Sequence, residues 1–239
     1  MFSEYANLLL HLTAKYTGQN LTDFQVRQFC RFGDMLLEWN QKMNLTRITE
    51  PKEIILKHFV DSMVLARHLE GNRVADLGTG AGFPGIPLKI LKPELEMLLL
   101  DSLKKRLKFL DAVCRELQLS NVKTIHERVE NIGRDASYRS SFDTVTARAV
   151  ASLPVLSEYA LPLLKRGGLF LAPKGPQAET ELEESREALR LLGGELEKLE
   201  PVEMGENAEN HVILIIRKKN DTPAGYPRKA GTPKKFPIL

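Results

Sequence analysis

The segment from Val74 to Gly85, which reads VADLGTGAGFPG, constrains the fold of this chain more than any other. A short apolar run meets a cluster of glycines and then a second apolar stretch, which is typical of a buried strand that turns into a helix. Gly78, Gly80 and Gly82 can adopt positive φ angles and lack a Cβ, so they let a ligand approach the main chain closely. The segment therefore predicts an α/β fold with a nucleotide-like ligand at this turn, the alternative being a turn that serves only packing.

The glycine spacing also fits a dinucleotide site. Gly80, Gly82 and Gly85 match the G-x-G-x-x-G pattern. Asp101 follows about 20 residues further on, near the separation expected of a ribose-binding carboxylate in an NAD enzyme. The pattern alone therefore leaves NAD open as the ligand.

The charges beside the glycines favour a different ligand. Asp76 ends the strand directly before the turn, where it would repel a pyrophosphate. Pro84 and Pro87 remove N–H donors that a pyrophosphate would need at the start of the helix. S-adenosylmethionine carries an ammonium group, a sulfonium and a ribose diol but no phosphate, so Asp76 and Asp101 would each have a partner. We therefore expect S-adenosylmethionine rather than NAD.

Length and composition indicate one α/β domain with an extension. The chain has 239 residues, of which 43% are hydrophobic and 27% are charged, and no apolar run approaches a membrane span. Its two cysteines, Cys30 and Cys114, form no metal-binding cluster, and the N-terminus lacks the layout of a signal peptide. We expect a cytoplasmic monomer without a bound metal and without a membrane partner.

The hydrophobic patterns divide the chain into three parts. Residues 1–70 are expected to form a helical extension, residues 71–219 the main domain, and residues 220–239 a basic tail. The predicted strands are Arg73–Leu77, Glu96–Asp101, Val122–His126, Phe142–Ala147, Gly168–Pro173, Glu195–Glu203 and His211–Arg217. Helical patterns separate most of them, which predicts a Rossmann-like, mostly parallel sheet of seven strands. The last two are joined by a short link, so the last strand should be antiparallel, as in the methyltransferase version of this sheet.

Charged side chains follow several of these strands at their carboxyl ends. They are Asp76, Asp101, Glu127, Arg148 and Lys174. Because ligands of such sheets bind at this edge, we expect the site there. Asp101 is placed to accept both ribose hydroxyls, the alternative being a cap for the following helix.

The C-terminal tail is basic, while the rest of the chain is slightly acidic. Arg228, Lys229, Lys234 and Lys235 are expected to contact phosphates of a polyanionic partner without reading sequence. A solubilising tail and a flap over the cofactor are the alternatives. If these four residues only contact the polyanion, deletion of residues 226–239 should weaken the use of that partner and spare cofactor binding.

A set of motifs makes a family resemblance specific. They are NLT at 44–46, KHFVDS at 57–62, DLGTGAGFPGIPL at 76–88, LLDSLKKR at 99–106, TARA at 146–149, PKG at 173–175 and RKAGTPKK at 228–235. Together they resemble the RsmG (GidB) family of class I bacterial methyltransferases of 16S ribosomal RNA, from about residue 20 to the C-terminus. The resemblance implies methyl transfer from S-adenosylmethionine to N7 of a guanosine in the 530 loop, position 527, with the small ribosomal subunit or an assembly intermediate as partner. A methyltransferase for another base or a protein, and a non-catalytic ribosome assembly factor, are the alternatives.

The resemblance also implies cofactor-binding positions. These are Gly78 and Phe83 in the glycine turn, Val129 and Glu130 after the third strand, and Arg148 after the fourth. Phe83 would offer an apolar wall, and Val129 and Glu130 would border the adenine. A solvated charge at a helix end is the alternative for Glu130.

Two cations and two further polar residues are candidates for the chemistry. Arg148 could contact guanine O6, an RNA phosphate or the cofactor carboxylate, since a bidentate contact with O6 and N7 would occupy the reacting nitrogen. Lys174 is expected to contact a phosphate, the alternative being a solvated lysine. Asn44 and His58 are expected to line the pocket, the alternative for His58 being a residue of the core.

Overall fold

A seven-stranded sheet forms the centre of the computed structural model, which describes residues 1–205 and 211–239. The strands are β1 (Arg73–Leu77), β2 (Glu96–Asp101), β3 (Val122–His126), β4 (Phe142–Thr146), β5 (Leu164–Lys174), β6 (Gly194–Val202) and β7 (His211–Lys218). Their order is β3-β2-β1-β4-β5-β7-β6. β1 to β5 pair in parallel, and β7 is antiparallel to both β5 and β6. The predicted α/β sheet with an antiparallel last strand is therefore confirmed.

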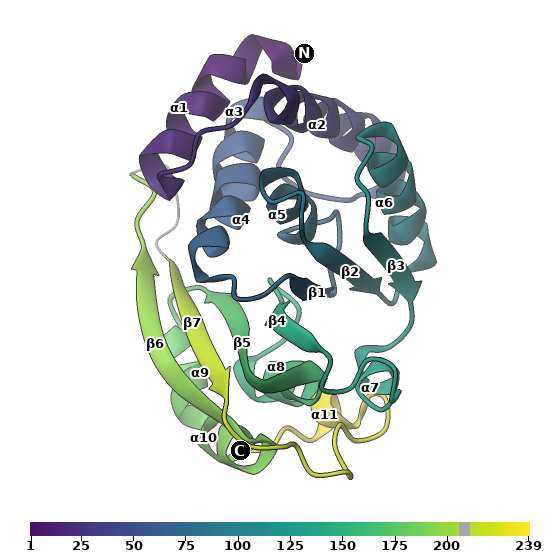
Figure 1. Cartoon of the computed structure of the whole chain (residues 1–239), viewed down its shortest axis with the longest axis vertical. Coiled ribbons are helices and arrows are strands. Elements are labelled where there is room, and N and C mark those ends of the chain that lie inside the picture. Colours follow the sequence, from purple (N-terminus) through teal and green to yellow (C-terminus); the bar gives the residue numbers. More distant parts are fainter. Residues whose placement is uncertain (206–210) are drawn as a thin grey trace.

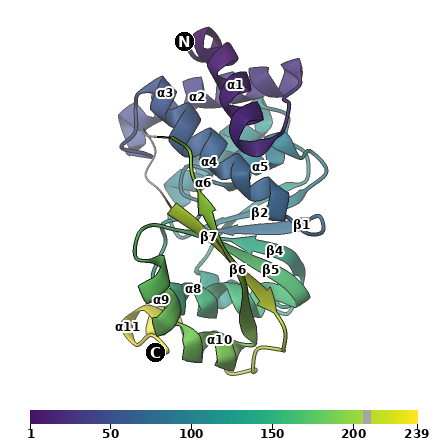
Figure 2. The ribbon, with the colours of Figure 1, turned by 90° about the vertical axis from the view of Figure 1, so that its left-hand side faces the viewer.

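Both faces of the sheet are covered, as Figure 2 shows. Successive side chains of a strand point to opposite faces, so Val74 and Leu99 join one buried cluster while Ala75 and Leu98 join the other. Burial on both faces explains why β2 carries apolar residues at four consecutive positions, Met97 to Leu100, instead of alternating with polar residues.

Helices of the first 68 residues cover one face together with α5 and α6 (Figure 1). They are η1 (Phe2–Tyr5), α1 (Ala6–Thr17), α2 (Asp23–Met43), α3 (Pro51–Ile54), the π-helix η2 (Ile55–Val60), α4 (Asp61–Met63) and η3 (Val64–His68). α2 begins at a capping box, in which Thr22 and Gln25 exchange side-chain and backbone hydrogen bonds. The Gln25 side chain also donates to the Ile90 carbonyl at 2.8 Å, which ties α2 to the helix after the glycine turn.

The remaining helices follow the strands. They are α5 (Gly85–Leu91), α6 (Lys104–Glu116), α7 (Val129–Ile132), α8 (Leu153–Ala160), η4 (Leu161–Leu163), α9 (Ala178–Glu184), α10 (Arg186–Leu192) and α11 (Thr232–Lys235). α8, α9 and α10 cover the second face of the sheet (Figure 2). Among the described helices, none combines the length and the apolar character needed to cross a membrane.

The C-terminal tail (residues 220–239) packs against the helices on the second face of the sheet, beside α7 and α8 (Figure 1). The Arg139 guanidinium donates to the carbonyls of Tyr226 at 2.6 Å and Thr222 at 2.7 Å, and Arg134 donates to the Pro227 carbonyl at 2.6 Å. The tail consists of irregular segments and turns and contains the one-turn helix α11. These arginine contacts fix its path across the protein.

Candidate functional site

Asp76 lies at the centre of the carboxyl edge of the sheet and is fully buried. Its Oδ2 accepts hydrogen bonds from the Thr79 hydroxyl at 2.6 Å and the Gly85 N–H at 3.0 Å. Its Oδ1 is also buried and receives no hydrogen bond from the described residues. Burial raises the pKa of Asp76 to about 6, against the opposing effect of these two donors. A buried acceptor without a donor is costly, so Asp76 fits a ligand that carries an ammonium group.

The glycine turn brings main chain beside this carboxylate. Gly80 has a φ of 62°, and a Cβ at this position would meet only the Gly78 carbonyl, at 3.9 Å. At Gly85, by contrast, a Cβ would lie 2.4 Å from the Leu99 side chain and 2.9 Å from Asp76 Oδ2. Gly80 therefore leaves space for a ligand, while Gly85 permits the hydrogen bond to Asp76.

Asp101 ends β2 next to the same turn and is 3% exposed. Its Oδ2 accepts from the Gly80 N–H at 3.0 Å and from Arg106 at 3.1 Å, and its Oδ1 accepts from the Leu103 N–H at 2.8 Å. Leu103 is the N-cap residue of α6, so the capping interpretation describes part of its role. A carboxylate offers about four lone-pair positions, and these three donors occupy three of them. One position remains for a ribose hydroxyl, and a second becomes available if the Arg106 side chain moves away.

Arg148 follows β4 and is held by the helical extension. Its Nη1 donates to the Lys57 carbonyl at 3.1 Å and to Asp61 Oδ2 at 2.7 Å, and its Nη2 lies 3.3 Å from His58 Nδ1. The guanidinium also lies 5.3 Å from the centre of the Phe83 ring, a cation–π contact. These contacts use both hydrogens of Nη1 and one of Nη2. Among the described residues nothing accepts from Nε–H or from the second Nη2 hydrogen, so both remain for a ligand.

Asp61 is the residue that fixes Arg148, and sequence reasoning did not select it. Its Oδ1 pairs with His211 Nε2 at 3.0 Å, so it joins the start of β7 to α4. Burial alone would raise the pKa of Asp61, but the hydrogen bond from His211 and the charge of Arg148 outweigh burial and lower it. The signal was present in the KHFVDS motif, where Asp61 stands three residues after His58.

His58 connects Arg148 to the segment after α2. Its ring stacks on Phe83 with centroids 4.5 Å apart, and its Nε2 lies 2.8 Å from the Thr46 hydroxyl. Burial and then the charge of Arg148 lower the pKa of His58 to about 4, so the ring is neutral at pH 7. A neutral ring can accept from Arg148 at Nδ1 and donate to Thr46 at Nε2. The structure thus places His58 beside Arg148, whereas Asn44 is exposed at the end of α2 in a left-handed conformation.

Phe83 belongs to an aromatic cluster and is 6% exposed. Its ring lies 5.4 Å from Phe32 and 6.2 Å from Phe59. So little of the ring is accessible that a ligand contact at Phe83 would come mainly through its backbone. Through Phe83, the cluster packs against both the glycine turn and the His58 ring.

Val129 and Glu130 begin α7, after β3. Val129 is half-buried, and Glu130 is buried, so Glu130 is not the solvated charge considered as an alternative. Glu130 Oε1 accepts from the Gly231 N–H of the tail at 2.8 Å and from the Tyr159 hydroxyl at 3.3 Å. The tail thus reaches a residue that the family resemblance assigns to the cofactor.

Lys174 ends β5 and is 9% exposed. Its Nζ donates to the Ala151 carbonyl at 2.8 Å and to Glu181 at 2.7 Å. Glu181 also accepts from the Leu153 N–H at 2.7 Å, at the start of α8. Lys174 is therefore neither solvated nor free at the surface, and it holds the segment that follows Arg148.

The four basic tail residues differ in their surroundings. Arg228 forms an ion pair with the buried Glu158, Nη2 to Oε2 at 2.6 Å, so its guanidinium already has a partner. Lys229, Lys234 and Lys235 are exposed. Only the lysines of this set remain accessible to a polyanion.

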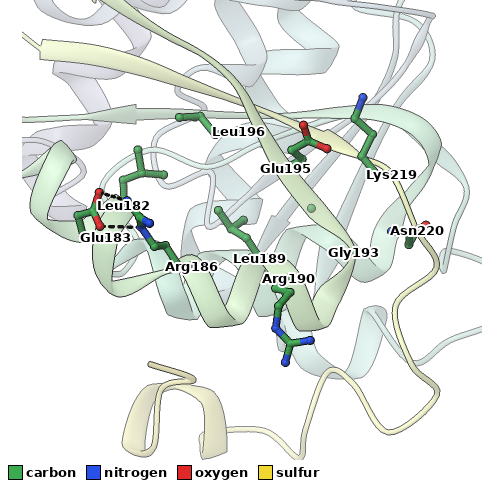
Figure 3. A pocket seen from close by; sticks show the side chains of 11 residues that line it. Leu182, Glu183, Arg186, Leu189, Arg190, Gly193, Glu195, Leu196, Lys219 and Asn220 are labelled. Atoms are coloured by element: carbon green, nitrogen blue, oxygen red, sulfur yellow. Dashed lines mark hydrogen bonds and ion pairs between the residues drawn. The ribbon is translucent and has the colours of Figure 1, made fainter.

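A groove of about 470 Å³ lies elsewhere, between α10 and β6 (Figure 3). Leu182, Leu189 and Leu196 form its apolar part, and Arg186 pairs with Glu183 at its rim. Its lining contains none of the predicted site residues. The groove is therefore separate from the carboxyl edge.

Comparison with known proteins gives matches over the whole chain. A family model described as GidB, rRNA small subunit methyltransferase G, matches residues 25–212. A protein of Desulfitobacterium hafniense named ribosomal RNA small subunit methyltransferase G is 54% identical over 239 residues, which cover 100% of both chains. A protein of the same name from Macrococcus caseolyticus is 50% identical and covers 97% of each chain.

Solved structures share the fold at lower identity. TrmN from Thermus thermophilus aligns with a TM-score of 0.52 at 20% identity, covering 66% of this chain and 48% of that one. An S-adenosylmethionine-dependent O-methyltransferase from Thermotoga maritima aligns with a TM-score of 0.52 at 18% identity, covering 79% and 72%. These likenesses support the sheet architecture described above.

Proposed function

This chain belongs to the GidB family, rRNA small subunit methyltransferase G, and from that premise we propose that it methylates 16S ribosomal RNA with S-adenosylmethionine as methyl donor. The full-length match at 54% identity is the observation that carries the proposal. The target atom that the motifs imply is N7 of the guanosine at position 527. The partner is the small ribosomal subunit or an assembly intermediate.

The cofactor's amino-acid end would lie between Asp76 and Arg148. Asp76 Oδ1 would accept from the ammonium group, since it has no other donor among the described residues. Nε and Nη2 of Arg148 form one edge of the guanidinium, which suits a carboxylate bound side-on, and no described residue accepts from Nε. The two residues are near enough for the charge of Arg148 to lower the pKa of Asp76. This favours the cofactor carboxylate over guanine O6 or an RNA phosphate as the partner of Arg148.

The remaining cofactor contacts follow the sheet edge. Asp101 would accept one ribose hydroxyl, and Val129 and Glu130 would border the adenine. The glycine turn would contact the cofactor through backbone groups of Gly78, Gly80, Gly82 and Phe83. S-adenosylmethionine supplies the methyl group as an electrophilic sulfonium.

The reaction at N7 requires positioning rather than proton removal. N7 of guanine carries a free lone pair, so no general base is needed. His58 is neutral at pH 7 and is engaged with Arg148 and Thr46, which agrees with an orienting role. Orientation of this kind can contribute roughly 7 to 11 kcal/mol in favourable systems.

The test is methyl transfer to defined RNA substrates. Purified protein and tritiated S-adenosylmethionine should label 16S rRNA, either as small subunits or as free RNA, and mapping should place 7-methylguanosine at position 527. Comparison of the two substrates identifies the partner. Labelling of another base, of a protein or of nothing would refute the proposal.

A further inference from the structure

The C-terminal tail makes two contacts with buried carboxylates, Glu158 of α8 and Glu130 of α7. Arg228 binds Glu158 through Nε at 3.0 Å and Nη2 at 2.6 Å, and its backbone N–H donates to the same carboxylate at 2.6 Å. Glu158 is 1% exposed, and Arg228 is the only cation that pairs with it among the described residues. The second contact is the hydrogen bond from the Gly231 N–H to Glu130.

The Arg228 contact anchors the tail to α8, and the Gly231 contact reaches Glu130 on α7. Glu130 is 2% exposed, and its described hydrogen-bond donors are Gly231 and Tyr159. Burial, and then the charge of Glu130, raise the pKa of Tyr159 to about 12, so its hydroxyl remains a donor at neutral pH. Without the tail, Glu130 would keep one of these two donors.

The backbone of α7 is fixed by the same segment. A Cβ at Gly133, directly after α7, would lie 2.8 Å from the Pro227 ring, so the tail lies close against the end of this helix. Arg134 donates to the Pro227 carbonyl at 2.6 Å on the same side. The tail is therefore packed and hydrogen-bonded against the C-terminal end of α7.

We propose that Arg228 and Gly231 are positioning residues of the cofactor site, because the docked tail holds Glu130 and α7 where they border the adenine. The inference rests on the proposed function and deepens it. It also reverses the expectation that removal of the tail spares cofactor binding. Arg228 is thereby assigned to the protein's own architecture, and the RNA contacts of the tail fall to its exposed lysines.

The experiment measures the affinity for S-adenosylhomocysteine by calorimetry in three full-length variants. Arg228→Ala should weaken binding by roughly 5- to 150-fold, the usual range for coupling between two sites. Lys235→Ala removes a positive charge from the same tail at an exposed position and should leave the affinity unchanged. Equal affinity of Arg228→Ala and the wild type would overturn the inference.

A third variant separates positioning from folding. Arg228→Ala leaves Glu158 buried and unpaired, which by itself destabilises the protein. Arg228→Ala with Glu158→Gln removes that unpaired charge, so thermal stability should recover while the affinity remains low. Recovery of both would mean that Arg228 acts only on stability, and the inference would be wrong.

Hydrogen exchange gives an independent readout in the wild type. Because linkage is reciprocal, S-adenosylhomocysteine should slow exchange of the Gly231 amide. Unchanged exchange at saturating ligand would overturn the inference. Wild-type protein that binds no S-adenosylhomocysteine would instead refute the proposed function itself.

Discussion

Replacement of Asp76 by asparagine tests the electrostatic argument for the cofactor site. The side chain is fully buried, and its pKa is raised from 3.8 to about 6. The difference corresponds to about 3 kcal/mol at 1.36 kcal/mol per pKa unit. Because the folded pKa lies above the ordinary value, the folded protein holds the proton more tightly than the unfolded chain. This contribution to stability is complete below pH 3.8 and is lost as the pH rises through about 6.

The variant should therefore gain stability and lose cofactor affinity. At pH 8, Asp76→Asn is expected to raise the free energy of unfolding of the cofactor-free protein by up to about 3 kcal/mol, since the amide carries no charge. The same change removes a charge-assisted hydrogen bond to the ligand ammonium, worth about 1.5 to 3 kcal/mol, so S-adenosylhomocysteine should bind roughly 10- to 150-fold more weakly.

The pH dependence of binding provides the sharper measurement. In the wild type, about one-tenth of Asp76 is ionised at pH 5, so the affinity for S-adenosylhomocysteine should fall about tenfold between pH 7 and pH 5. In Asp76→Asn this dependence should disappear. Glu96→Gln, the same chemical change at an exposed residue of β2, serves as the control. An Asp76→Asn variant that binds with wild-type affinity and the wild-type pH profile would refute the reasoning.

Three further predictions test other parts of the site. Asp61→Asn weakens the buried ion pair that orients the arginine after β4, so the Kd for S-adenosylhomocysteine should rise at least several-fold in calorimetry, and an unchanged Kd would contradict that role. Gly85→Ala places a Cβ 2.4 Å from a leucine side chain, so thermal or urea unfolding should show a loss of about 1 to 3 kcal/mol. When the exposed tail lysines Lys229, Lys234 and Lys235 are changed together to alanine, the negative slope of log K against log salt for RNA binding should become less steep by roughly 2 to 3, while the affinity for S-adenosylhomocysteine stays the same. An unchanged slope would show that these lysines do not contact phosphate.

The sheet could be predicted from the sequence because its signals are local. The first three predicted strands agree with β1, β2 and β3 at both ends. The strand predicted from Gly168 is longer and begins at Leu164, where exposed residues of β5 interrupt the apolar run. Burial on both faces of the sheet produces the strong apolar pattern, and it weakens where a strand extends to the surface.

Contacts between distant segments could not be predicted in this way. The pairs Arg148–Asp61, Arg228–Glu158 and Gly231–Glu130 are separated by 87, 70 and 101 residues. Each joins groups that the linear sequence shows only as isolated charges or a glycine. The π-helix Ile55–Val60 was also missed, because its residues have the same apolar spacing as an ordinary helix.

The two ends of the chain support opposite sides of the same sheet edge. The helical extension supplies Asp61, His58 and the Lys57 carbonyl to Arg148, on the side proposed for the amino-acid end of the cofactor. The tail supplies Gly231 to Glu130, on the side proposed for the adenine. The parallel strands alone place Asp76 and Asp101, but neither flank is fixed by the sheet. Variants at Asp61 and Arg228, whose ion pairs anchor these two segments, should therefore change cofactor affinity more than changes at the amino ends of the strands, even though both residues lie outside the strand–helix repeat.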